Sequence, residues 1–212
     1  MQKILISIAI ILTSTINFSQ DKSKEILEII SNETSSYSSM NIEFKLTIKS
    51  IDFNETQIGT AVTEGNNFYY KTQDREVISN STDVWTYIVD DNECYIDALE
   101  DLDGGINPSE IMTIWEDNFK FKYLEQLETD SNGDKIHRIK LFPSNPKDSK
   151  YHTIILKINE TKKQIISATI KTKDGMTLYF IISKLSPNKE IKPDTFVWKN
   201  SSHPGVELID NR

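Results

Sequence analysis

The chain has 212 residues, 37% of them hydrophobic, and 32 acidic against 24 basic side chains give a formal net charge of −8. This length suits one domain of ordinary size. The acidic excess argues against a nucleic-acid partner, because phosphate binding needs a basic stripe. It also argues against a protein that lies on an anionic membrane surface, since such surfaces attract Lys and Arg clusters.

Residues 1–19 have the order of a secretory signal: Lys3, an apolar run over Ile4–Ile16 that includes Ser and Thr, and the small residue Ser19. The run is shorter than the about 20 apolar residues that span a bilayer. We therefore expect a removed signal peptide at 1–19 and one exported domain at 20–212. The alternatives are an uncleaved anchor or a buried first helix.

Cys94 is the only cysteine, so the chain has no internal disulfide and must be held together by packing. A lipid-anchored bacterial protein would carry its cysteine directly after the apolar run, where Ser19, Gln20 and Asp21 stand instead. We therefore expect a product without a lipid anchor. Cys94 lies in an expected strand and is interpreted as a packing residue rather than a nucleophile.

A helix is predicted over Asp21–Ser31, where Ile26, Leu27 and Ile30 share one face. The period changes to two from Asn41 onward, and turn residues separate one apolar alternation from the next. Further short strands are expected at 56–63, 67–72, 76–79, 83–89, 93–97, 120–126, 135–142, 152–159, 164–172, 176–184 and 206–209.

A short inserted helix is predicted after the acidic stretch 100–105. Asn107-Pro108-Ser109-Glu110 gives proline at the first helical position and an acidic first turn. The helix would carry the apolar side chains of Ile111, Met112, Ile114 and Trp115.

The predicted fold class is mainly β with a few helices (α+β). Such a long antiparallel sheet should curl, since open sheets rarely exceed about ten strands without curling or splitting. We expect a curled sheet forming an incomplete barrel, capped by an N-terminal helix and a short inserted lid helix.

The sequence indicates a binding protein rather than an enzyme. His137, His152 and His203 stand on separate elements, and no metal, phosphate-loop or nucleophile motif is found, so no cofactor or metal is expected. Apolar side chains remain as the candidate ligand-binding residues. Together, on one curled sheet, they could line a cavity for an apolar ligand.

The order of several segments resembles the outer-membrane lipoprotein carrier family, LolA. The similar segments are Gly59-Thr60-Ala61-Val62, Phe68-Tyr69-Tyr70, Ile78–Tyr87 with its Trp-x-Tyr, Asn107–Met112, Lys173-Asp174-Gly175-Met176, and Pro193-Asp194-x-Phe196 with Pro204-Gly205-Val206-Glu207. Two departures matter. Asn80-Ser81-Thr82-Asp83 replaces the family's usual Asp-Gly turn, and Glu64-Gly65-Asn66 replaces a Lys-Arg-Pro turn whose Arg latches the lid.

The resemblance implies a soluble, monomeric periplasmic shuttle for acylated lipoproteins, loaded by an inner-membrane lipoprotein-releasing transporter and unloaded to an outer-membrane acceptor. The alternative is an envelope sensor or lipid-binding regulatory protein with the same sheet. On strand alternation, the predicted acyl cavity is lined by Phe44, Leu46, Phe68, Tyr70, Trp85 and Tyr87, with Ile111, Met112, Ile114 and Trp115 on the lid.

Overall fold

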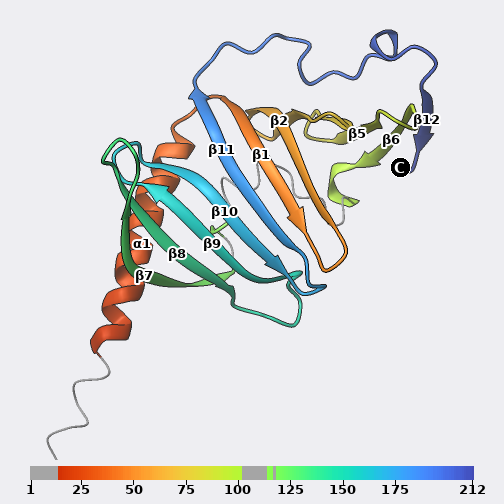
Figure 1. Ribbon diagram of the computed structural model, residues 1–212. Coiled ribbons are helices and arrows are strands. Elements are labelled where there is room, and N and C mark those ends of the chain that lie inside the picture. The colour runs from red at the N-terminus through yellow and green to blue at the C-terminus, as the bar shows by residue number, and fades with distance from the viewer. Residues whose placement is uncertain (1–13, 102–113, 117) are drawn as a thin grey trace, which may run out of the picture.

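A computed structural model of the protein describes residues 14–101, 114–116 and 118–212. It contains one sheet of twelve strands in the order β12-β6-β5-β4-β3-β2-β1-β11-β10-β9-β8-β7 (Figure 1). The elements are α1 (Ser14–Ser35), β1 (Met40–Lys49), β2 (Asn54–Glu64), β3 (Asn67–Lys71), β4 (Arg75–Ser79), β5 (Asp83–Ile88), β6 (Glu93–Ala98), η1 (Leu99–Asp101), β7 (Phe119–Thr129), β8 (Lys135–Pro143), β9 (Tyr151–Asn159), β10 (Gln164–Thr172), β11 (Thr177–Pro187), η3 (Asn200–Ser202) and β12 (Glu207–Asp210).

The sheet consists of two meanders that meet at its centre. Strands β1 to β6 run in sequence order toward one edge, and β11 back to β7 run toward the other. The antiparallel pair β1–β11 joins the halves, with Ile48 opposite Leu178. The antiparallel prediction holds for eleven strands, whereas β12 lies parallel to β6 because the chain after β11 crosses to that edge and enters it in the direction of β6.

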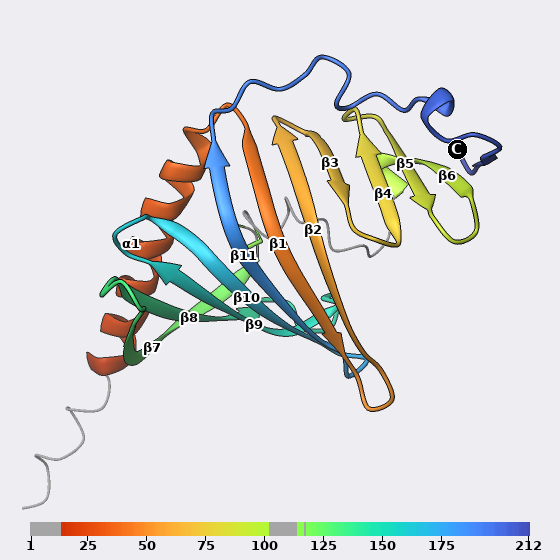
Figure 2. The same cartoon turned by 45° about the horizontal axis from the view of Figure 1, so that its top comes forward.

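The sheet curls without closing, as predicted for an incomplete barrel. Strands β7 and β12 form its two edges and do not pair with each other. Register shifts at Glu43/Phe44, Ile165/Ser167 and Leu124/Glu128 mark irregularities in the strand pairing, and such bulges bend a strand and increase its twist. Figure 2 shows the β7–β11 half turned under α1 and the β3–β6 half extending away from it.

Helix α1 lies against the β7–β10 half of the sheet (Figure 1). Leu27 and Ile30, one turn apart, are buried in the main hydrophobic core with strand residues such as Ile139 and Leu156. The predicted helix is confirmed and is longer than expected, beginning at Ser14 within the expected signal segment. Among the residues that the structure describes, no helix is both long and apolar enough to cross a membrane.

The predicted lid helix falls largely outside the described residues, including Ile111 and Met112. Ile114 and Trp115 are described and lie in a turn. Trp115 is buried in the main core, which also contains Leu27 and Ile30, and Ile114 packs against that core. Ser31 of α1 donates a hydrogen bond to Glu116, at 2.7 Å between oxygens. This short segment is thus attached to α1.

A buried polar group lies beside the main core. Tyr123 and His137 share a hydrogen bond of 2.8 Å between the phenolic oxygen and Nδ1. Glu160 lies 3.6 Å from Nε2 of His137, and the Lys22 ammonium lies 4.1 Å from the centre of the Tyr123 ring. Burial lowers the pKa of His137 below its usual 6.5, and Lys22 and Lys135 lower it further, against the opposing effect of Glu160.

We expect acid to weaken the fold through His137. Because its pKa is lower in the folded state, the unfolded chain binds the proton first, so stability falls as the pH drops below about 6.5. The loss ends below the folded-state pKa. Urea unfolding at pH 7.5 and pH 5.5 should show a smaller stability difference for His137→Gln than for the wild type. An equal difference in both proteins would contradict this assignment.

Candidate functional site

The concave face of the sheet contains a cavity of about 450 Å³ beside the pair β1–β11. Its apolar lining comes from β1, β3, β11 and the β10–β11 turn: Phe44, Leu46, Ile48, Tyr70, Met176 and Leu178. Its polar lining consists of Gln57, Thr72, Arg75, Lys150, Tyr151, Thr172, Lys173 and Asp174. The volume lies within the range of about 300–1,000 Å³ typical of small-molecule sites.

Strand pairing explains why these side chains share a face. Directly paired residues in a sheet point to the same side. Leu46 is opposite Gln57 and Phe180, and Ile48 is opposite Leu178. The Phe44 ring stacks on Phe180 at 5.2 Å between centroids. Phe44 therefore forms part of the floor at the junction of the two meanders, and the stacked ring of Phe180 supports it from the core.

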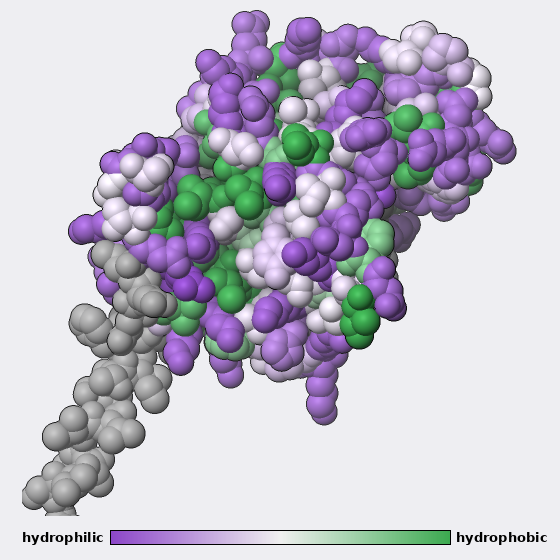
Figure 3. Space-filling view, in the orientation of Figure 1, coloured by the Kyte–Doolittle hydropathy of each residue, from purple (hydrophilic) through white to green (hydrophobic). Residues whose placement is uncertain are grey.

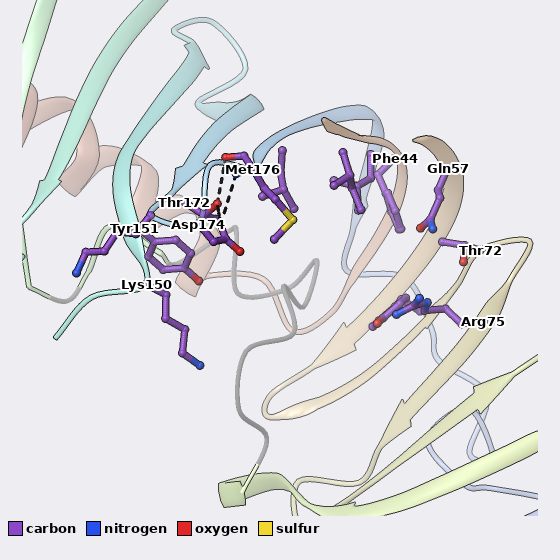
Figure 4. Close-up of a pocket in the computed structure, with 14 residues that line it drawn as sticks. Phe44, Gln57, Thr72, Arg75, Lys150, Tyr151, Thr172, Asp174 and Met176 are labelled. Carbon is purple, nitrogen blue, oxygen red and sulfur yellow. Dashed lines mark hydrogen bonds between the residues drawn. The ribbon is translucent and has the colours of Figure 1, made fainter. Parts of the chain in front are cut away.

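The opposite walls come from distant parts of the chain (Figure 4). Phe44, Gln57, Thr72 and Arg75 lie on one side, and Lys150, Tyr151, Thr172 and Asp174 lie on the other. The space between them has an apolar floor and a rim that carries charge, a combination suited to a ligand with an apolar chain and a polar end.

Asp74 orients the cationic part of the rim. Its carboxylate accepts hydrogen bonds from Thr72 Oγ1 at 2.5 Å and from Arg75 Nε at 3.2 Å. Partial burial would raise the pKa of Asp74, but these bonds and the Arg75 charge outweigh it, so the pKa is lowered from its usual value. Asp74 therefore stays ionised at neutral pH and holds the Arg75 guanidinium at the rim.

The structure brings together three of the predicted cavity residues, Phe44, Leu46 and Tyr70. Phe68 belongs to a second small core with Val77 and Val84, which Tyr70 contacts from the side of the cavity. Ile114 and Trp115 belong to the main core. Ile111 and Met112 lie outside the described residues.

Trp85 and Tyr87 do not share the face of the cavity residues. Tyr70 is opposite Val77, and Val77 is opposite Thr86, so Thr86 is the β5 residue on the concave face. Its neighbours Trp85 and Tyr87 therefore point to the convex face, which corrects their expected orientation. There Tyr87 contacts the C-terminal segment, with ring-centroid distances of 4.5 Å to His203 and 6.0 Å to Trp198.

The sequence prediction missed several lining residues. Ile48 continues the alternation of Phe44 and Leu46 along one strand, and Leu178 alternates with Phe180, so both could have been found from periodicity. Lys150, Lys173 and Asp174 lie in turns, and Tyr151 and Thr172 lie at strand ends, where alternation does not predict which side chains face the cavity. In the part of the chain that the structure describes, no cluster of three or more His, Cys, Asp or Glu side chains could hold a metal ion.

Solved structures with a similar fold exist, although no family model and no curated protein sequence matches the chain. An uncharacterized conserved protein from Thermus thermophilus matches with a TM-score of 0.59 at 7% identity, over 90% of this chain and 99% of that one. LprF from Mycobacterium bovis matches with a TM-score of 0.50 at 11% identity, over 81% and 95%.

A structure described as a LolA superfamily protein, from Nitrosomonas europaea, is also among the neighbours. It is 10% identical and covers 84% of this chain and 98% of its own, with a TM-score of 0.43. At 7% and 11% identity, the likeness to the Thermus thermophilus and Mycobacterium bovis structures concerns the fold alone.

Proposed function

We propose that this protein is a soluble periplasmic carrier that binds acyl chains of lipoproteins in the concave cavity and moves them from the inner to the outer membrane. The observation that supports this proposal most directly is the apolar floor of Phe44, Leu46, Ile48 and Leu178 in a cavity about 450 Å³ in size. The ordered sequence resemblance to the lipoprotein carrier family supports the choice of cargo.

The size of the cavity suits partial coverage of such a cargo. A methylene group takes up about as much space as a water molecule, about 30 Å³, so the cavity has room for about 15 methylenes, one acyl chain. Three chains have about 40 methylenes, and at about 0.8 kcal/mol each their exposure to water costs roughly 30 kcal/mol. A carrier that covers one chain deeply and the others loosely can still release its cargo.

The proposed cycle needs two membrane partners. The sequence contains no nucleotide-binding motif, so we assign loading to an inner-membrane lipoprotein-releasing transporter and unloading to an outer-membrane acceptor that binds the lipid more tightly. The test is retention of a lipopeptide by the purified protein in buffer. Binding no stronger than that of the deacylated peptide would overturn the proposal.

Filling the cavity should abolish lipopeptide binding. Leu46→Trp places an indole in the space of the acyl chain, and we expect affinity at least about tenfold weaker, because even half of the chain left in water costs several kcal/mol. Fluorescence competition with a labelled lipopeptide measures it. Lys45→Trp is the matched control, since Lys45 is the exposed neighbour on the convex face. Equal affinities of the two variants would place the acyl chain elsewhere.

A further inference from the structure

The turn between β1 and β2 presents apolar side chains to solvent at the end of the sheet's central hairpin. Ile51 is 99% exposed and Phe53 is 47% exposed. Both lie in a turn where polar residues are the rule. Figure 2 shows this turn projecting beyond the neighbouring strands.

The projecting turn lies at the same end of the sheet as the charged rim of the cavity. Lys49, the last residue of β1, pairs with Thr177 at the start of β11. The adjoining β10–β11 turn includes the cavity residues Lys173 and Asp174, and the backbone N–H of Lys173 donates to the Lys150 carbonyl at 3.1 Å. Three turns therefore meet at what we call the tip end: 49–54, 144–150 and 173–176.

The charge at the tip end differs from that of the chain as a whole. The three turns carry four exposed Lys and three exposed Asp, in a chain whose net charge is −8: Lys49, Lys147, Lys150 and Lys173 against Asp52, Asp148 and Asp174. The net negative charge of the chain therefore does not repel the tip end from a phospholipid surface. It would repel the rest of the molecule from an anionic membrane. Figure 3 shows hydrophobic atoms among hydrophilic ones at the end where the β1–β2 turn lies in Figure 1.

We propose that the tip end docks on a phospholipid bilayer, with Ile51 and Phe53 inserted at its surface and the lysines of the neighbouring turns at the level of the lipid phosphates. Such insertion buries exposed apolar area while the ammonium groups stay in the polar layer. This inference rests on the proposed acyl-binding function. Docking would bring the rim of the cavity to the membrane that supplies or receives the acyl chain.

Flotation with vesicles of phosphatidylethanolamine and phosphatidylglycerol tests the docking directly. We expect the wild-type protein to float with the vesicles and Ile51→Ser/Phe53→Ser to bind them at least about tenfold more weakly. Leu208→Ser is the matched control, since Leu208 is 43% exposed in β12 at the far edge of the sheet. It should bind as the wild type does.

A second measurement separates this inference from the proposed function. The double variant should still bind the lipopeptide in vesicle-free buffer with wild-type affinity, because neither changed residue lines the cavity. Lack of flotation by the wild type, or equal flotation by the double variant, overturns membrane docking and leaves a protein partner or a second copy as the occupant of the turn. If the wild-type protein does not bind the lipopeptide in vesicle-free buffer, the proposed carrier function is overturned instead.

Discussion

Phe44→Ala is expected to lower the free energy of unfolding by about 3–5 kcal/mol, the usual cost of truncating a fully buried phenylalanine. The Phe44 side chain is 1% exposed and stacks on Phe180 of β11. Its removal deletes a contact between the two meanders and enlarges the existing cavity. Urea unfolding followed by circular dichroism measures the change.

The matched control for this variant is Tyr179→Ala. Tyr179 also carries an aromatic ring on β11, but it is 39% exposed and lies on the convex face opposite Thr47. We expect its loss to cost less than about 1 kcal/mol. A Phe44→Ala effect no larger than that of Tyr179→Ala would contradict the position of Phe44 in the core.

Gly59→Ala is expected to destabilise the protein by about 2–3 kcal/mol, although it adds one methyl group. A Cβ at Gly59 would lie 2.5 Å from Cζ of Phe44 and 2.6 Å from the carbonyl oxygen of Lys71. The second atom belongs to the backbone of β3 and cannot move without disturbing its pairing with β2. The same urea unfolding experiment measures the effect.

Two further variants sharpen this test. Thr60→Ala changes the exposed neighbour on the other face and should stay within about 0.5 kcal/mol of the wild type. In a double-mutant cycle, Phe44→Leu should relieve only part of the Gly59→Ala cost, because the clash with the Lys71 carbonyl remains. Additive effects of the two substitutions would show that Phe44 and Gly59 do not interact.

Local patterns were sufficient to predict most of the strands. The alternation of Ile42, Phe44, Leu46 and Ile48 predicted both the strand and the face that it buries, and Leu27 and Ile30 did the same for the helix. These patterns are local because the spacing of apolar residues within a single helix or strand is enough to define its buried face.

The pairing between strands could not be predicted from such local patterns. Trp85 and Tyr87 share a face with each other, but which face that is depends on the pairing across three intervening turns, and a shift of one residue reverses it. The cavity depends on the pairing of β1 with β11, which no local pattern specifies. The parallel addition of β12 depends on the path of a segment without regular alternation.

The central pair of the sheet also has a consequence for how the chain reaches its folded state. Strand β1 lies near the start of the sequence and its partner β11 ends at Pro187, so the middle of the sheet closes only when nearly the whole chain is present. Contacts between residues so far apart in sequence slow folding, because the loop between them must be ordered first. A chain that stops before Thr177 would leave Phe44 without the stacked ring of Phe180 and one edge of β1 unpaired, and exposed strand edges promote aggregation.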